Sequence, residues 1–333
     1  MRNETRIAFN GLTARIGELN SVSSVDKTFT VTPSVQQKLE NRIQESSEFL
    51  KRINIIGVTD MEGEKLKLGV SGPIASRTNT KNKDRETRDL STLDNDRYQC
   101  VKTNYDTHIG YGTLDAWAKF PDFQARVRNV ILQRQALDRM VVGFHGVSIA
   151  DDTDIAKNPL LQDVNKGWLQ NMREKAPQRA MSSGKTAGKV RIGADGDYHH
   201  LDAAVFDAIT LLDPWYREDT NLVAIVGREL MHDKYFPLIN ANAGNVEKLA
   251  ADVIISQKRI GGLQAASVPY FPPNAILITR FDNLSIYYQE GGRRRQMIEN
   301  PRRDRIENFE SSNDAYVIED LGLAALVENI ELA

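Results

Sequence analysis

The side chains that could carry out chemistry are scattered along this 333-residue chain and lack the spacing of a catalytic or metal site. Of the five histidines, His199 and His200 are adjacent, so on a helix or a strand they point to different faces. The sequence has neither an H-x-x-x-H pair nor a pair of cysteines, the patterns that commonly bind zinc. We therefore expect no metal, no cofactor and no catalytic residue.

One fragment matches part of a catalytic motif, and one cysteine is a candidate nucleophile by residue type alone. Gly184, Lys185 and Thr186 match the end of a phosphate-binding loop, but the full motif needs a glycine five residues earlier, where Arg179 stands. Cys100, the single cysteine, lies in a strand pattern with no linked histidine motif, which favours a structural thiol over a nucleophile. The alternative interpretation of the whole chain is a soluble α/β enzyme with an unrecognised site, to be sought first in the loop at 182–197.

The strongest basic cluster of the sequence is formed by Arg293, Arg294 and Arg295, and three further arginines follow within ten residues. One interpretation is a solvated turn, because acidic residues lie among these arginines. The other is a contact with phosphate or with acidic residues of a neighbouring subunit, which guanidinium groups bind well. The sequence favours neither, and we treat the three arginines as candidate inter-subunit contacts.

The element best placed to organise these segments is a long helix, predicted over residues 120–144. Pro121 suits a first helical position, where its missing N–H costs nothing. Apolar residues recur at steps of three and four from Phe123 to Phe144, and arginines, Arg139 among them, fill the other face. A helix of this length spans roughly 35 Å, about twice the mean for globular proteins. It can therefore serve as a spine to which separate parts attach.

The composition is that of an ordinary soluble protein, with 41% hydrophobic and 26% charged residues. The net charge of -2 gives no basic bias of the kind that nucleic-acid-binding proteins show. A single cysteine suits a reducing compartment. No apolar run approaches the roughly 20 residues of a membrane helix, and the N-terminus lacks the apolar core of a signal peptide. We expect a protein that is made in a cytoplasm and has no membrane partner.

Residues 53–110 have the pattern of a long two-stranded projection. The first limb shows a strand, a turn at Glu62-Gly63 and a second strand, and the chain returns as a strand after residue 97. Between the limbs, residues 77–97 are dense in charge and almost free of apolar residues, so they are expected to stay solvated. An isolated hairpin is only marginally stable in water, so we expect this projection to lie on a neighbouring subunit. Its candidate contact residues are Arg77, Lys81, Lys83, Arg85, Glu86 and Arg88.

The remaining segments alternate between helical and strand patterns. Helices are predicted over 160–174, 200–212, 228–240 and 245–255, a buried strand over 221–227, and strands through most of the chain after residue 262. The first 52 residues are helical in pattern, with a Ser- and Thr-rich break at 21–32. Several of these elements have no obvious partner within the chain, which indicates a subunit of an assembly.

Longer stretches of the sequence resemble the major capsid proteins of P-two-like tailed bacteriophages. These stretches are MRNETR, QESSEFLKRINI, TLDAWAKFPDFQ, NPLLQDVNKGWLQ, LAADVIISQKRIGGL, VPYFPPNAILIT and NLSIYYQ, and they are spread over essentially the whole chain. The resemblance implies an α+β chain with the Hong Kong-type phage capsid fold. Its segments would be an N-terminal arm (1–52, of which about 1–30 is scaffold-like), an extended β-hairpin loop (53–110), a peripheral domain with the spine helix (111–197), an α/β axial domain (198–300) and strands returning to the peripheral domain (301–333).

The same resemblance implies a structural, non-enzymatic role in a virion capsid that is assembled in the host cytoplasm. Copies of the chain would form hexamers and pentamers that close into an icosahedral shell around double-stranded DNA, with a portal protein at one vertex. An internal scaffold-protease protein would guide assembly and trim the arm. The segment 25–32 lies between two predicted helices and suits a cut, so we predict cleavage near Phe29 and Thr30.

Overall fold

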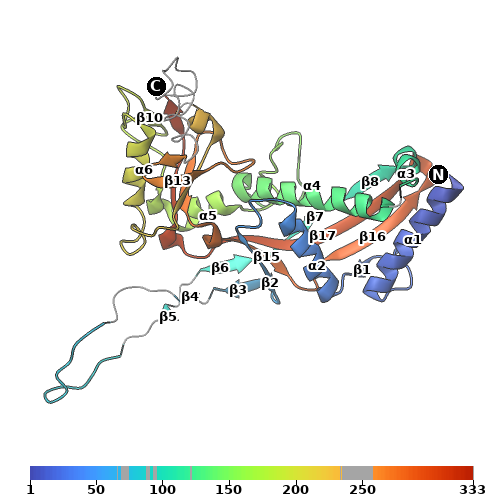
Figure 1. Ribbon diagram of the computed structural model, residues 1–333, viewed down its shortest axis with the longest axis horizontal. Coiled ribbons are helices and arrows are strands. Elements are labelled where there is room, and N and C mark those ends of the chain that lie inside the picture. The colour runs from blue at the N-terminus through green and yellow to red at the C-terminus, as the bar shows by residue number, and fades with distance from the viewer. Residues whose placement is uncertain are drawn as a thin grey trace, which may run out of the picture.

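The computed structural model of the chain describes residues 1–65, 67–68, 75–87, 91–92, 96–120, 122–232, 234 and 258–332. These residues form an elongated body in which a long sheet with a helix along it occupies most of the length, and a second sheet forms a lobe at one end (Figure 1). A hairpin projects from the body near the base of the lobe (Figure 1). The fold therefore combines helices and sheets in the α+β manner predicted.

The long sheet is built around β17 (Arg305–Ile318), a strand of 14 residues. Its other strands are β1 (Phe29–Thr30), β2 (Asn54–Val58), β7 (Val101–Asn104), β8 (Thr107–Gly110), β15 (Leu284–Gln289) and β16 (Arg294–Asn300). One edge of β17 pairs with β15 and β16 in turn, and the opposite edge pairs with β7 and β8. Two short strands extend the sheet beyond β15 and β16. Strand β1 pairs antiparallel with β16, and β2 pairs parallel with β15.

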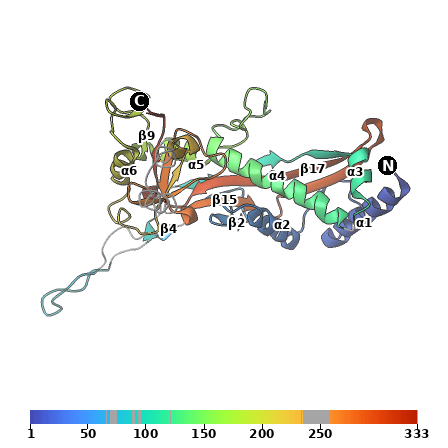
Figure 2. The ribbon, with the colours of Figure 1, turned by 45° about the horizontal axis from the view of Figure 1, so that its top comes forward.

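Helices pack along this sheet. The predicted spine helix is α4 (Phe123–His145), which begins three residues later than expected, and Pro121 lies outside the described residues. It runs along the sheet beside α2 (Pro33–Glu45), whereas α1 (Asn3–Asn20) and α3 (Tyr111–Trp117) lie at the end far from the lobe (Figure 2). The periodic apolar pattern predicted α4 because one face of the helix is buried along its length.

The lobe is organised around a six-stranded sheet. Its strands, in order, are β12 (Arg259–Ile260), β13 (Leu263–Ala266), β11 (Val223–Val226), β14 (Ile276–Thr279), β18 (Ala325–Val327) and β9 (Ala180–Met181). Along β11, Val223 and Ile225 belong to a core shared with the long sheet, whereas Ala224 and Val226 belong to a second core with α6 (Leu201–Ile209). Burial on both faces explains why β11 is a continuous apolar run in the sequence.

Smaller elements complete the described fold. Helix α5 (Trp168–Lys175) packs against α4 and β17, and β10 (Val190–Ile192) pairs in parallel with β19 (Ile330–Leu332). The 3-10 turns are η1 (Pro177–Arg179), η2 (Phe281–Asn283), η3 (Pro301–Arg303) and η4 (Leu321–Leu323). In the part of the chain that the structure describes, no helix is both long enough and apolar enough to cross a membrane.

The projecting hairpin includes fewer residues than the predicted range of 53–110. Its limbs pair as β3 (Glu62–Glu64) with β6 (Arg97–Gln99) and as β4 (Lys67–Leu68) with β5 (Ser91–Thr92). The two ends of the predicted range pair into the long sheet instead, as β2, β7 and β8. The turn predicted at Glu62-Gly63 is wrong. The chain bends at 59–61, because β2 stays beside β15 whereas β3 leaves the sheet to meet β6.

Three predicted helices differ in extent from the structure. The helix expected over 200–212 is α6, which ends at Ile209. The helix expected over 160–174 begins only at Trp168, and upstream of it Leu161 takes the left-handed backbone conformation with φ of 56°, which a helix does not contain. The helix expected over 228–240 is present at 228–232 and 234. Residues 235–240, and the helix expected over 245–255, lie outside the described residues.

The division predicted at residue 300 does not match the membership of the sheets. Strands β15 and β16, placed in the axial domain, belong to the long sheet. Strands β18 and β19, expected to return to the peripheral domain, pair instead with β14 and β10 in the lobe. The chain therefore leaves the lobe before β15 and re-enters it after β17. Sequence order does not reveal this path, because long-range pairing decides which sheet a strand joins.

Candidate functional site

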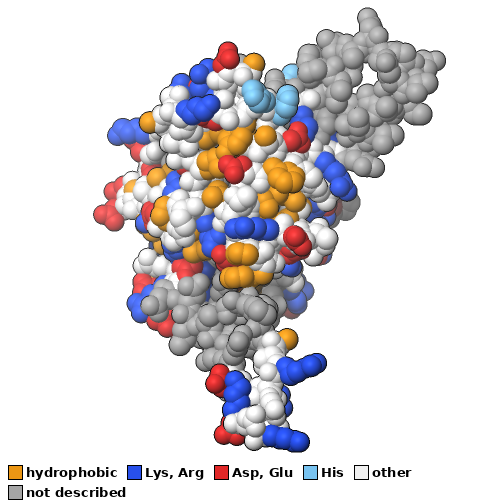
Figure 3. Space-filling model, turned by 90° about the vertical axis from the view of Figure 1, so that its left-hand side faces the viewer, with side chains coloured by type: hydrophobic (Ala, Val, Ile, Leu, Met, Phe, Trp, Pro, Cys, Tyr) orange, Lys and Arg blue, Asp and Glu red, His pale blue; other side chains and the backbone are white. Residues whose placement is uncertain are grey.

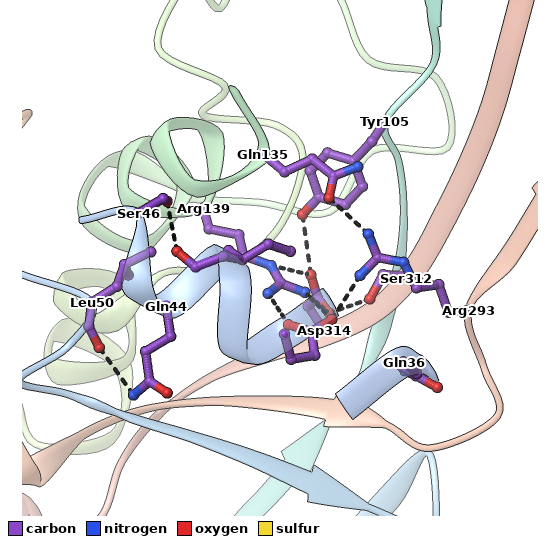
Figure 4. A network of polar contacts seen from close by, with 12 residues as sticks. Gln36, Gln44, Ser46, Leu50, Tyr105, Gln135, Arg139, Arg293, Ser312 and Asp314 are labelled. Atoms are coloured by element: carbon purple, nitrogen blue, oxygen red, sulfur yellow. Dashed lines mark hydrogen bonds and ion pairs between the residues drawn. The ribbon is translucent and has the colours of Figure 1, made fainter. Parts of the chain in front are cut away.

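A buried ion network connects α2 and α4 with the strands of the long sheet (Figure 4). Its two guanidinium groups belong to Arg139 of α4 and to Arg293, just before β16, and both side chains are 1% exposed. Arg139 donates to both carboxylate oxygens of Glu40 on α2. Arg293 Nη1 donates to Glu40 Oε1 at 2.7 Å. Glu40, which is also 1% exposed, is thus shared by the two arginines.

Asp314 of β17 forms one end of the network. Arg139 Nε and Nη2 each donate to a different oxygen of Asp314, both at 3.1 Å. The same carboxylate accepts hydrogen bonds from the Tyr105 hydroxyl at 3.1 Å and from Ser312 Oγ at 2.6 Å. Asp314 is fully buried, so these donors replace the water that would otherwise surround its charge.

Glu310, also on β17, forms the other end and accepts from Arg293 Nε at 2.7 Å. Burial opposes ionisation of Glu310, but Arg293 and Arg295 outweigh it and lower the pKa of this carboxyl to about 2. Burial likewise opposes ionisation of Glu40, and its pKa is nevertheless lowered by Arg139 and Arg293. Both acids are therefore ionised at neutral pH and balanced by arginines, which makes the network a structural tie and not an acid–base pair.

Sequence reasoning missed Glu40 and placed Arg139 on the wrong face of its helix. Gln36, Glu40 and Ile43 form the buried stripe of α2, at steps of four and three residues. On α4, Arg139 lies beside Met140 among the buried positions, not on the exposed face. A charged residue inside the buried stripe of two separate helices was the available signal for an internal ion pair.

The three arginines of the basic cluster have different environments, and they lie at the start of a strand and not in a solvated turn. Arg293 is bound inside its own chain, so the prediction that it contacts a neighbouring subunit is wrong. Arg294 is exposed. Arg295 is half-buried, and its Nε donates to Asn308 Oδ1 at 2.9 Å. Arg294 is therefore the member of the cluster that a neighbour can reach most readily.

A second cluster of charges holds the base of the hairpin. Lys65, just after β3, and Lys175, at the end of α5, both pair with Asp96, with Lys175 Nζ 2.5 Å from Asp96 Oδ1. Lys65 Nζ also donates to the carbonyl oxygen of Ile318 on β17 at 2.6 Å. Burial opposes ionisation of Asp96, but Lys175 and Lys65 lower its pKa. These contacts fix the point at which the hairpin leaves the body.

The tip of the hairpin is exposed to solvent. Among residues 75–87, which the structure describes, all but Thr78 are exposed. The predicted contact residues among them are Arg77, Lys81, Lys83, Arg85 and Glu86. Arg88 lies outside the described residues. The tip therefore presents both positive and negative side chains to whatever lies next to it.

The predicted cleavage site lies in a strand. Phe29 and Thr30 form β1 and pair with Arg295 and Arg294 at the outer edge of the long sheet. Phe29 is 8% exposed. The break expected between the two helices is irregular up to residue 28, whereas Phe29 and Thr30 are paired and not free. The predicted cut itself stays a prediction.

The fragments that suggested catalysis form no site. The backbone N–H groups of Lys185 and Arg191 already donate to the carboxylate of Asp197, at 2.6 and 2.8 Å, so a phosphate at Gly184 would have to displace it. Burial raises the pKa of the Cys100 thiol to about 12, which keeps it protonated and unreactive. Within the described ranges, no group of three acidic, histidine or cysteine side chains is placed to hold a metal ion.

Two solved structures share this arrangement of long sheet, spine helix and lobe. A chain of the satellite phage P4 procapsid, a particle that includes the size determination (Sid) protein, superposes with a TM-score of 0.83 and 49% sequence identity over 100% of this chain and 99% of that one. A chain from the capsid of an empty GTA particle has a TM-score of 0.52 at 15% identity, over 86% and 90% of the two chains, and shares the fold alone. The fold is that of a phage shell subunit of the Hong Kong type.

Sequence comparison narrows this class to one family. The chain matches the family described as "Phage major capsid protein, P2 family" over residues 8–330. It is 52% identical to the capsid protein of Escherichia phage P2 over 342 aligned residues, which cover 100% of this chain and 96% of the relative. It is 41% identical to the major capsid protein of Serratia phage KSP20, over 100% of this chain and 98% of that relative. The chain belongs to the P2 family of phage major capsid proteins and is a structural subunit of a phage shell.

Proposed function

We propose that copies of this chain assemble as hexamers and pentamers into an icosahedral shell that encloses double-stranded DNA. The observation that carries the proposal is the hairpin, which is pinned at its base by Lys65, Asp96 and Lys175 and exposed at its tip. The tip projects well away from the body (Figure 1). A two-stranded projection gains stability when it packs on another surface. In a shell, that surface belongs to a neighbouring copy.

The outer end of the lobe supplies a second surface suited to subunit contact. Phe206, on α6, is 68% exposed, and Trp215, which follows this helix, is 47% exposed. Hydrophobic side chains gather between charged ones on this end of the molecule (Figure 3). Aromatic residues are enriched in protein–protein interfaces, and contiguous apolar patches mark such sites. We assign this surface to contact with the lobe of a neighbouring copy.

The proposal includes partners other than the chain itself. An internal scaffold-protease protein guides assembly in the host cytoplasm and removes the arm near Phe29 and Thr30, and a portal protein occupies one vertex. The P4 procapsid includes a size determination protein, which supports assembly with a helper protein. The net charge of -2 supports a genome that is contained by the shell and not tightly bound to it.

Electron microscopy of the purified chain, expressed with and without its scaffold partner, tests the proposal. We expect closed shells built from hexameric and pentameric units. Discrete monomers or dimers under every condition would refute the assembly proposal and return attention to an enzymatic function.

The charges of the hairpin tip give a second test. Each exposed ion pair stabilises by only about 0–1 kcal/mol, so many such contacts must add up across a shell. Changing Arg85 and Arg88 together to glutamine is expected to lower the yield of closed shells without changing the urea midpoint of the isolated subunit. The matched control is Arg134→Gln, an arginine 61% exposed on α4. A yield equal to that of the control would count against a role for the tip.

A further inference from the structure

The predicted cut site is covered in the folded chain. Besides the pairing of β1 with β16, Val31 N donates to Arg293 O at 2.9 Å, and Met297 N donates to Val25 O at 2.8 Å. The Phe29 side chain lies with Met297 in an apolar core. A protease binds an extended segment whose backbone groups are unpaired. Residues 25–31 must therefore leave β16 before they can be cut.

Upstream of the cut site, the arm (residues 1–31) is held by contacts that can open without leaving a buried charge unpaired. Phe9, Leu12 and Ile16 of α1 pack into the same apolar core. The ion pair of Arg6 with Glu299 lies at the surface, with side chains 42% and 30% exposed. Water can solvate both of these groups when the arm leaves, so the pair opposes detachment only weakly.

Downstream of the cut site, α2 is held by contacts whose opening would leave buried charges unpaired. Glu40 neutralises Arg139 and Arg293, and all three side chains are 1% exposed. Gln36 adds two hydrogen bonds of 2.9 Å to backbone groups at the end of β15 and just beyond it. Detaching α2 would leave two buried arginines without Glu40, and removing one partner of a buried pair is strongly destabilising.

We propose that residues 1–31 are built as a detachable unit, and that the Glu40 network sets the point at which detachment stops. The arm leaves the body as one piece, and the cut, which adds water across one peptide bond, takes place only in this detached state. Helix α2 stays in place because Glu40 holds it. The inference rests on the arm removal of the proposed function and adds the order of events and the structural boundary.

Limited proteolysis of the full chain by thermolysin, with new N-termini identified by mass spectrometry, tests the detachment step. We expect the new N-terminus nearest the start of the chain to lie within residues 25–33, and any cut in the exposed hairpin tip is scored separately. Phe9→Ala removes a buried anchor of α1 and should speed this cut at least tenfold without moving it, because cleavage follows the population of the open form. Ile7→Ala is the matched control on the same helix, since Ile7 is 73% exposed. Equal rates in the two variants would overturn detachment before cutting.

Glu40→Gln tests the boundary. Without the charge on Glu40, α2 should open with the arm, so that at least half of the new N-termini found before residue 54 lie at residue 35 or beyond. The control is Glu45→Gln on the same helix, where Glu45 pairs with Arg42 at the surface. Should Glu40→Gln fail to fold, Gln36→Ala removes only the two hydrogen bonds of that side chain and is expected to move the boundary in the same direction. Fragments confined to residues 25–33 in the folded variant would overturn the boundary role.

Electron microscopy of the same samples separates this inference from the proposed function. Wild-type shells combined with an unmoved boundary in the variants refute the inference alone. A wild-type chain that forms no shells, either alone or expressed with its scaffold partner, refutes the proposed function, whatever the fragments are.

Discussion

Arg139→Met is the most informative single change, because Arg139 joins two carboxylates that have almost no access to water. Its guanidinium donates to Glu40 and to both oxygens of Asp314, and all three side chains are 1% exposed. Methionine keeps the apolar stem and removes the charge. Glu40 retains Arg293, but among the residues that the structure describes, the Asp314 carboxylate retains only the hydroxyl groups of Tyr105 and Ser312. Removing one partner of a buried ion pair costs about 3–5 kcal/mol, and we expect a loss of unfolding free energy of this size.

Urea denaturation of the subunit, at a concentration too low for shells to form, measures this loss, because assembly would otherwise stabilise the folded chain. Tryptophan fluorescence, to which the buried Trp168 contributes, reports unfolding of the core. Arg134→Met is the matched control: the same substitution on the same helix, at an arginine 61% exposed whose partner is Asp138 at 2.5 Å. Surface pairs of this spacing stabilise by about 0.3–0.5 kcal/mol, so the control should barely shift the urea midpoint.

We expect the unfolding free energies of the two variants to differ by several kcal/mol and to depend similarly on urea concentration. If Arg139→Met and Arg134→Met agree within about 1 kcal/mol, the network does not tie the helices to the sheet in the way described.

Three further predictions follow from the described contacts. The pKa of Glu310 is lowered to about 2 from an ordinary value of 4.5. The ionised carboxylate therefore stabilises the folded chain fully above pH 4.5, and this stabilisation is lost as the pH falls toward 2. We expect the unfolding free energy to drop by up to about 3 kcal/mol over that interval, and by less in Glu310→Gln. Gly143→Ala would place a Cβ 2.2 Å from Trp168 Cζ3 and should destabilise the subunit by about 1–3 kcal/mol in urea, whereas Gly112→Ala, with no atom within 4 Å, should not destabilise it. Cys100 should react with a soluble thiol reagent at least about 100-fold more slowly in the folded chain than in urea, and equal rates would contradict its burial.

The elements that the sequence predicted well are those whose burial produces a pattern of apolar residues within a short stretch of the chain. Helix α4 shows its buried face as a period of three and four residues, and β11 shows burial on both faces as four consecutive apolar residues. Exposure of the hairpin tip was likewise predictable, because a charged segment without apolar residues cannot bury itself.

The buried network could be suspected from a charged residue in the buried stripe of α2 and of α4, but the sequence does not show which residues pair. Arg139 is separated by 99 residues from Glu40 and by 175 from Asp314, so nothing near any of the three indicates its partner. Arg293 looked like a surface charge for the same reason, since its bond to Glu40 spans 253 residues. The sheet membership of β15 and β16 was missed because it depends on pairing with β17, which follows them in the sequence.

The 14 residues of β17 also have a mechanical consequence. A strand of this length extends about 46 Å. It is flanked on one edge by β15 and β16 and on the other by β7 and β8. Hydrogen bonds between antiparallel strands lie perpendicular to them, so a pull along β17 loads many of these bonds together in shear, whereas a pull across it would open them one after another. The long sheet of the subunit therefore resists tension along β17 better than tension across it.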